Sequence, residues 1–148
     1  SFITRISYIK PRNQNTKPDF MSKFLPPTTS DLLPGEEFRV VLDDSPLIRG
    51  QYMVSNMGRV WSIRLGRVLK SSPCSKGYLR IDVKIQGERV RKRVHRLVLQ
   101  TFVGMPVGTK SITDHIDGDK TNNRLSNLEW VDYYENNRRM YERLKKVA

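Results

Sequence analysis

The residues of this chain that could carry out chemistry lie close together, between Asp114 and Asn137. Asp114 offers carboxylate oxygens and Asn136 offers an amide oxygen, and both are ligands for a hard divalent cation such as Mg²⁺. His115 directly follows the carboxylate, where it can take the proton from an attacking water. A cation that clamps a phosphate, beside a base that activates water, is what phosphodiester hydrolysis needs. These residues therefore indicate a hydrolytic site, provided that the fold brings them together.

Two short strands and a helix are the elements that must position these residues. Turn-forming residues fill the loop from Asp117 to Asn123, and the apolar and aromatic residues 128–131 predict the second strand. Asp132 and Glu135 have the spacing of a capping box, which predicts that a helix begins near Tyr133. This helix would carry apolar residues on one side and basic residues elsewhere, namely Met140, Tyr141 and Leu144 against Arg138, Arg139, Arg143, Lys145 and Lys146.

The order and spacing of these residues resemble the HNH endonuclease motif. The matching pattern is Asp114-His115-x-Asp-Gly, then Asn127-Leu-x-Trp-Val, with Asn136 farther on. It is similar to the variant of phage intron-encoded nicking homing endonucleases, whose last member is Asn. The resemblance implies that His115 is the general base. It also implies that Asp114 and Asn136 are the metal ligands and that Asn127, the middle member of the catalytic motif, braces the motif loop.

The resemblance extends upstream of the motif. Residues 54–60, 77–80 and 94–98 are similar to the NUMOD4-like segments that precede the motif in these enzymes, so that the match covers roughly residues 37–137. It implies a DNA endonuclease of the homing or nicking type that uses Mg²⁺ or another divalent cation and no zinc.

The charge of the chain points to an acidic polymer as its partner. Lysine and arginine number 27 against 15 acidic residues, which gives a formal net charge of +12. We expect duplex DNA, with structured RNA as the alternative. The arginines that we expect to contact it are Arg80, Arg89, Arg91, Arg93, Arg96, Arg138 and Arg139. Three of them, Arg89, Arg91 and Arg93, alternate along one predicted strand and therefore share a face of its sheet, where they suit phosphates.

Composition also excludes several kinds of site. One cysteine and two histidines cannot form a closed zinc site of four Cys or His ligands within one chain, nor an internal disulfide. No apolar run approaches the ~20 residues of a membrane span, and no signal-peptide core is present. We therefore expect a soluble intracellular protein, in a phage or bacterial cytoplasm or in a mitochondrion.

The expected fold class is α+β, with small antiparallel hairpins followed by the two strands and the helix of the motif. We expect a basic extended arm at residues 1–36, a β-rich nucleic-acid-binding region at 37–104, and the motif with its basic helix at 105–148. The arm is rich in proline and nearly free of acids, so we expect nucleic acid or a neighbouring protein to order it. Alternating residues predict a strand at 78–85, and residues 95–103 predict a short helix in which His95 is structural.

Two other functions fit part of the sequence. An HNH-derived, non-catalytic RNA-binding subunit of a large ribonucleoprotein, such as a mitochondrial ribosome, would keep the fold, the charge and the arm. A transcription factor that uses the basic sheet alone would explain the charge but not the metal-binding residues. The presence of Asp114, His115, Asn127 and Asn136 together favours the nuclease.

Overall fold

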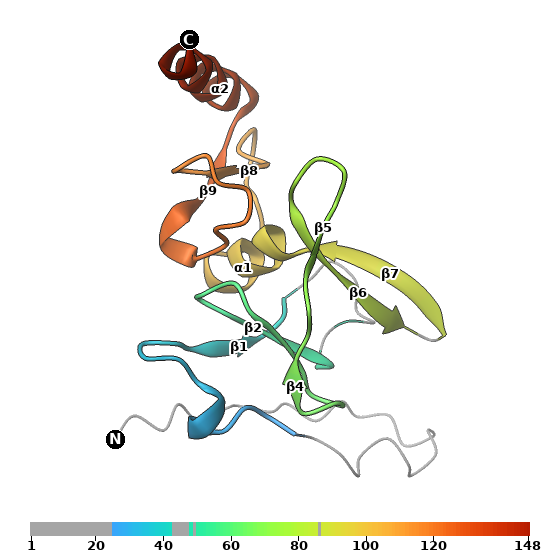
Figure 1. Ribbon diagram of the computed structural model, residues 1–148. Coiled ribbons are helices and arrows are strands. Elements are labelled where there is room, and N and C mark those ends of the chain that lie inside the picture. Colours follow the sequence, from blue (N-terminus) through green and yellow to red (C-terminus); the bar gives the residue numbers. More distant parts are fainter. Residues whose placement is uncertain (1–24, 43–47, 49, 86) are drawn as a thin grey trace.

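Short runs of alternating or apolar residues divide this chain into hairpins. The computed structural model describes residues 25–42, 48, 50–85 and 87–148, which form three antiparallel sheets and two α-helices (Figure 1). The first sheet pairs its strands in chain order: β1 (Phe38–Val40), β2 (Tyr52–Ser55), β3 (Val60–Ser62) and β4 (Arg67–Val68). The second sheet contains β5 (Ser72–Pro73), β6 (Leu79–Ile85) and β7 (Glu88–Arg93), and the third contains β8 (Ile112–His115) and β9 (Leu128–Val131).

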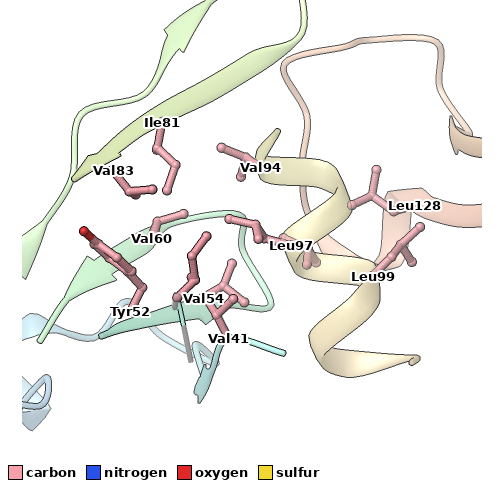
Figure 2. Packing of buried hydrophobic residues seen from close by; sticks show 12 residues of the cluster. Val41, Tyr52, Val54, Val60, Ile81, Val83, Val94, Leu97, Leu99 and Leu128 are labelled. Carbon is pink, nitrogen blue, oxygen red and sulfur yellow. The ribbon is translucent and has the colours of Figure 1, made fainter. Parts of the chain in front are cut away.

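Helix α1 (Val94–Phe102) follows β7 without a loop and contacts all three sheets. Most of its side chains are buried, including Leu97 and Leu99. Figure 2 shows Ile81 of β6 and Val54 of β2 pointing into the same core, and Leu128 of β9 packing beside the helix. Each such side chain contributes about 1.5–3 kcal/mol on burial. The helix therefore joins the three sheets through one core.

Part of the predicted arm lies against the first sheet. The Trp61 indole nitrogen donates a hydrogen bond to the Leu25 carbonyl at 2.7 Å, and the 3₁₀ helix η2 (Thr29–Asp31) follows. Arg59 then forms an ion pair with the buried Glu36 carboxylate. Residues 25–36 are thus held by β3 and the turn before it, whereas residues 1–24 lie outside the described residues.

Helix α2 (Tyr133–Val147) follows the third sheet and has no buried residue. Its N-terminus is capped as predicted, because the Asp132 side chain accepts a hydrogen bond from the Glu135 backbone nitrogen at 2.8 Å. Figure 1 shows this helix at the edge of the molecule, beyond β8 and β9. The antiparallel hairpins followed by two strands and a helix confirm the predicted α+β class. No helix in the described part of the chain is long and apolar enough to cross a membrane.

Candidate active site

Strand β8 ends with Asp114 and His115, and their side chains point to opposite faces of the strand. Successive side chains of a strand point to opposite faces, so adjacent Asp114 and His115 have different neighbours. His115 is 3% exposed and lies against the aromatic rings of the molecule's body, whereas Asp114 is 4% exposed and lies against α2. The two groups are therefore positioned by different parts of the fold.

The His115 ring is held by two rings and one amide. Its centroid lies 5.2 Å from that of His95 and 5.9 Å from that of Tyr78. Its Nε2 atom is 2.8 Å from the Asn123 amide oxygen Oδ1. An amide oxygen only accepts hydrogen bonds, so Nε2 is the donor in this contact.

His95, at the start of α1, is neutral in this environment. Burial, together with the neighbouring His115, Arg93 and Arg96, lowers the pKa of His95 to about 3. Its Nδ1 atom is buried, and no described residue forms a hydrogen bond with it. His95 therefore presents an uncharged ring edge to His115 and leaves one polar atom unpaired.

Asn127 ties together the loop between β8 and β9. Its Nδ2 atom donates hydrogen bonds to Asp117 Oδ1 and to the Asn122 carbonyl, each at 2.9 Å, and its Oδ1 atom accepts from the Asp117 backbone nitrogen at 3.0 Å. Hydrogen bonds from Asn122 and Asn127 hold the pKa of Asp117 below its usual value. The loop is thus closed around one amide side chain.

Asp114 binds two arginines of α2. Arg143 donates from Nη1 to Oδ1 and from Nη2 to Oδ2, both at 3.0 Å, and Arg139 donates from Nη1 to Oδ2 at 2.9 Å. Burial opposes ionisation, but the hydrogen bonds from Arg143 and Arg139 outweigh it and hold the pKa of Asp114 below its usual value. Arg139 also forms ion pairs with Glu129 and Glu135. The carboxylate is therefore ionised, and both of its oxygens have cationic partners.

The predicted cation ligands fit in chemical type, and in this structure arginines of α2 contact one of them, Asp114. Asp114 and Asn136 offer the oxygen donors that hard divalent cations prefer. Among the described residues, however, no hydrogen bond joins the Asn136 side chain to Asp114, and no group of three or more His, Cys, Asp and Glu could hold a metal ion. Guanidinium groups take the place that a cation would take at Asp114. A cation at Asp114 would therefore compete with Arg139 and Arg143 for the same oxygens.

A groove of about 740 Å³ lies beside this carboxylate, between α2 and the loop after β8. Basic and acidic side chains line it together, namely Arg138, Arg139, Arg143 and Lys146 with Asp117, Glu129 and Glu142. The groove is large enough for a piece of phosphate backbone, and its basic side chains have the matching charge.

The arginines of β7 form an exposed row. Arg89, Arg91 and Arg93 are exposed and alternate with half-buried residues, as a shared face requires. Asp82 lies opposite, with its carboxylate 3.7 Å from Arg89 and 3.9 Å from Arg91, at the weak end of ion-pair distances. The Arg93 guanidinium lies over the Tyr78 ring, which itself contacts His115. The row therefore leads toward the His115 imidazole.

The other predicted arginines differ in their surroundings. Arg80 lies opposite Arg93 in the strand register, and its Nε atom is buried without a hydrogen-bond partner among the described residues. Arg96 lies over the Trp130 ring at 5.2 Å. Arg138 forms ion pairs with Glu135 and Glu142, while Arg139 is part of the Asp114 cluster.

Sequence reasoning missed Asn123, Tyr78 and the role of Arg143. Asn123 looked like one of several turn residues, and only the fold shows its contact with His115. Arg143 could have been found, because it follows Arg139 by four residues and so lies on the same face of a helix.

The chain matches two family models. Residues 92–138 match the model described as HNH endonuclease, and residues 42–84 match the NUMOD4 motif. The first match contains α1 and the residues from Asp114 to Asn136 that were predicted to form the site, and the second contains most of the first two sheets.

Relatives and one solved structure agree with these matches. The chain is 43% identical over 83 residues to DNA endonuclease I-HmuI of Bacillus phage SP01, which is 55% of this chain and 47% of that protein. Two uncharacterized HNH endonucleases of Acanthamoeba polyphaga mimivirus are 41% and 36% identical, over 58% and 65% of this chain and 22% and 29% of their own lengths. A solved structure on DNA binding and cleavage by the HNH homing endonuclease I-HmuI matches 72% of this chain and 59% of its own, with a TM-score of 0.61 and 35% identity. This chain thus spans less than half the length of each of the three relatives.

Proposed function

We propose, since this chain carries an HNH endonuclease motif and is homologous to the phage homing endonuclease I-HmuI, that it hydrolyses phosphodiester bonds of duplex DNA. The observation that carries the proposal is the end of β8. There an ionised carboxylate and a fixed imidazole are adjacent in the chain and almost fully buried. A groove with basic side chains lies on the Asp114 side of β8, lined by the arginines that contact this carboxylate. A nicking activity of the homing type is the finer part of this proposal.

In this proposal His115 is the general base. With its proton on Nε2, held by Asn123, the imidazole can accept a proton from water at Nδ1. The ring is only 3% exposed, so bulk water reaches a small part of it and the position of an attacking water is restricted. General bases of this kind contribute about 10² to 10⁴-fold to a rate.

Asp114 and Asn136 are the residues that would hold a divalent cation, for which Mg²⁺ is our proposal. When bound, such a cation would polarise the scissile phosphate and offset the charge that develops in the transition state. Asp114 is suited to this role because it is ionised and buried. The guanidinium groups of Arg139 and Arg143 would first leave it, and phosphate oxygens in the groove are natural partners for them.

The β7 row and the groove would bind the DNA backbone. Phosphate contacts position a duplex without reading its sequence, which suits exposed arginines on a strand. Arg93 lies over the Tyr78 ring, which contacts His115, and Arg80 lies opposite Arg93 in the strand register, so we assign them the phosphates closest to the cut.

The test is cleavage of supercoiled plasmid by the purified chain with Mg²⁺ and with EDTA. Conversion of supercoiled to nicked circles in Mg²⁺ alone is expected, and the ratio of nicked to linear product separates nicking from double-strand cutting. A structured RNA of similar length serves as the comparison substrate. A chain that binds RNA more tightly than DNA, and that leaves DNA uncut with Mg²⁺ and Mn²⁺, would overturn the proposal in favour of an RNA-binding role.

A further inference from the structure

Asn123 is a buried amide whose hydrogen bonds are only partly satisfied. It is 4% exposed, and its Oδ1 atom accepts a hydrogen bond from His115 Nε2 at 2.8 Å. Its Nδ2 atom is buried and has no hydrogen-bond partner in the part of the chain that the structure describes. A buried donor without a partner is unfavourable, so the stability of the fold alone does not account for an amide here. The contact with His115 gives this side chain a role.

The turn between β2 and β3 holds Asn123 in place. Gly58 in this turn has φ +80°, and a Cβ atom on it would lie 2.7 Å from Asn123 Cβ and 2.8 Å from the Asn123 carbonyl oxygen. The Asn56 carbonyl also accepts a hydrogen bond from the Leu125 backbone nitrogen at 2.8 Å. Only glycine leaves room for this approach.

This contact joins two parts of the sequence that match different family models. Gly58 and Asn56 lie in the segment that matches the NUMOD4 motif, whereas Asn123 and His115 lie in the segment that matches HNH endonuclease. In Figure 1 the turn after β2 reaches toward the loop that precedes β9. The position of the imidazole therefore depends on a turn that is about 60 residues away along the chain.

We propose that Asn123 is a positioning residue for His115, and that the β2–β3 turn, through Gly58, holds Asn123 where its Oδ1 fixes the His115 proton on Nε2. Nδ1 is then the atom that accepts the proton from water. The His95 and Tyr78 rings restrict the tilt of the imidazole, and Asn123 decides its tautomer. The assignment of a catalytic consequence rests on the proposed function, whereas the tautomer itself does not.

The first test is the tautomer of His115, read from ring ¹⁵N chemical shifts at pH 8. The chain has two histidines, so His115 is identified by comparison with a His95→Phe variant. The Nε2–H form is expected in the parent and in Asn123→Asp, which keeps the acceptor oxygen. A mixture of both tautomers is expected in Asn123→Leu, which has a similar shape and no acceptor. An Nδ1–H form in the parent, or no change in Asn123→Leu, would overturn the proposal.

The second test is cleavage by variants that circular dichroism shows to be folded. Asn123→Leu is expected to lower kcat about 100-fold with little change in KM, because misplacing a reacting group by about 1 Å costs roughly that factor. Asn123→Asp is expected to recover part of the loss. Gly58→Ala should lower kcat as well. Gly50→Ala is the matched control and should leave kcat as in the parent, because Gly50 has nearly the same φ, +79°, and no atom of a described residue lies within 4 Å of the added Cβ.

The outcomes separate this proposal from the proposed function. Equal losses in Gly58→Ala and Gly50→Ala would show that backbone strain and not the Asn123 contact is responsible, and would overturn the role of the turn. A parent chain that cuts no DNA but shows the expected tautomers would remove the nuclease assignment and leave the positioning intact.

Discussion

The two sides of β8 differ in what holds them. The base half, which we define as His115, Asn123, His95 and Tyr78, is built from buried or half-buried rings and an amide on the body of the molecule. The carboxylate half, Asp114 with Arg139 and Arg143, depends on ion pairs to a helix that buries no side chain. Packing has one arrangement, whereas ion pairs can exchange partners. The comparison teaches that the imidazole we propose as the base is held by packing, while the carboxylate we propose as a cation ligand has partners that can be exchanged.

The largest expected effect breaks the base half. His115→Ala should lower the rate of DNA cleavage by about 10² to 10⁴-fold, because the general base is lost. DNA affinity should change little, since the ring is buried and makes no expected phosphate contact. Single-turnover cleavage and a binding titration measure the two effects separately. Equal cleavage by parent and variant would show that the imidazole is not the base.

The next effect concerns the exposed row that leads to the base half. Replacing Arg89, Arg91 and Arg93 by Gln should flatten the slope of log affinity for duplex DNA against log salt by about 2 to 3 units, at about 0.9 per phosphate contact. Affinity titrations at four salt concentrations measure this slope. The matched control replaces Arg64, Arg67 and Lys70, which removes the same charge from exposed residues of the first sheet region. Equal slopes for the two triple variants would mean that net charge and not the row binds DNA.

A smaller effect sharpens the account of the carboxylate half. Arg143→Gln removes a guanidinium that bridges both Asp114 oxygens, so Mn²⁺ should bind the free protein about tenfold more tightly, a difference of ~1.4 kcal/mol. Electron paramagnetic resonance of free Mn²⁺ measures this without any cleavage. Arg138→Gln is the control, because Arg138 contacts Glu135 and Glu142 and not Asp114. If both variants bind Mn²⁺ as the parent does, Arg143 does not compete for the site.

The smallest effect concerns the stability of the base half. The pKa of His95 is about 3 in the folded chain, against 6.5 as its usual value, mainly because of burial. Between these values the unfolded chain binds a proton that the folded chain does not, so the free energy of unfolding falls as the pH drops below about 6.5. His95→Phe should remove roughly 1 to 2 kcal/mol of the loss in unfolding free energy between pH 7 and pH 5. Urea unfolding at the two pH values measures it, and an unchanged pH dependence in the variant would contradict the buried, neutral state of His95.

The individual strands and helices could be predicted from the sequence, because residues close together in the chain determine them. Alternation predicted β6, apolar spacing predicted α1, and the Asp132 cap set the start of α2. The spacing of Asp114, His115 and Asn127 indicated the motif, and the resemblance to HNH endonucleases followed from it. These features depend on neighbours that are a few residues apart.

The contacts that position the site residues could not be predicted from the sequence, because they join residues that are far apart in the chain. Nothing in the sequence around Asn123 distinguishes it, as the residue that contacts His115, from the turn residues beside it. The close approach of Gly58 to Asn123 depends on how two hairpins pack against each other. The helical spacing of Met140 and Leu144 predicted a helix with one apolar face. In the structure Leu144 is 63% exposed, and the face that contacts Asp114 is the one that carries Arg139 and Arg143. The electrostatic attraction of a buried carboxylate decides that orientation.

Hydrogen exchange of Asp114→Asn tests most directly the claim that contacts between Asp114 and the arginines of α2 hold the carboxylate half, while packing holds the base half. An isolated helix of 15 residues is marginal in water, so α2 depends on its anchor. The account predicts that α2 amides lose protection in Asp114→Asn while α1 amides keep theirs, and that Glu142→Gln, which alters only an exposed ion pair of α2, leaves both as in the parent. Unchanged protection of α2 in Asp114→Asn, or an equal loss in α1, would contradict it.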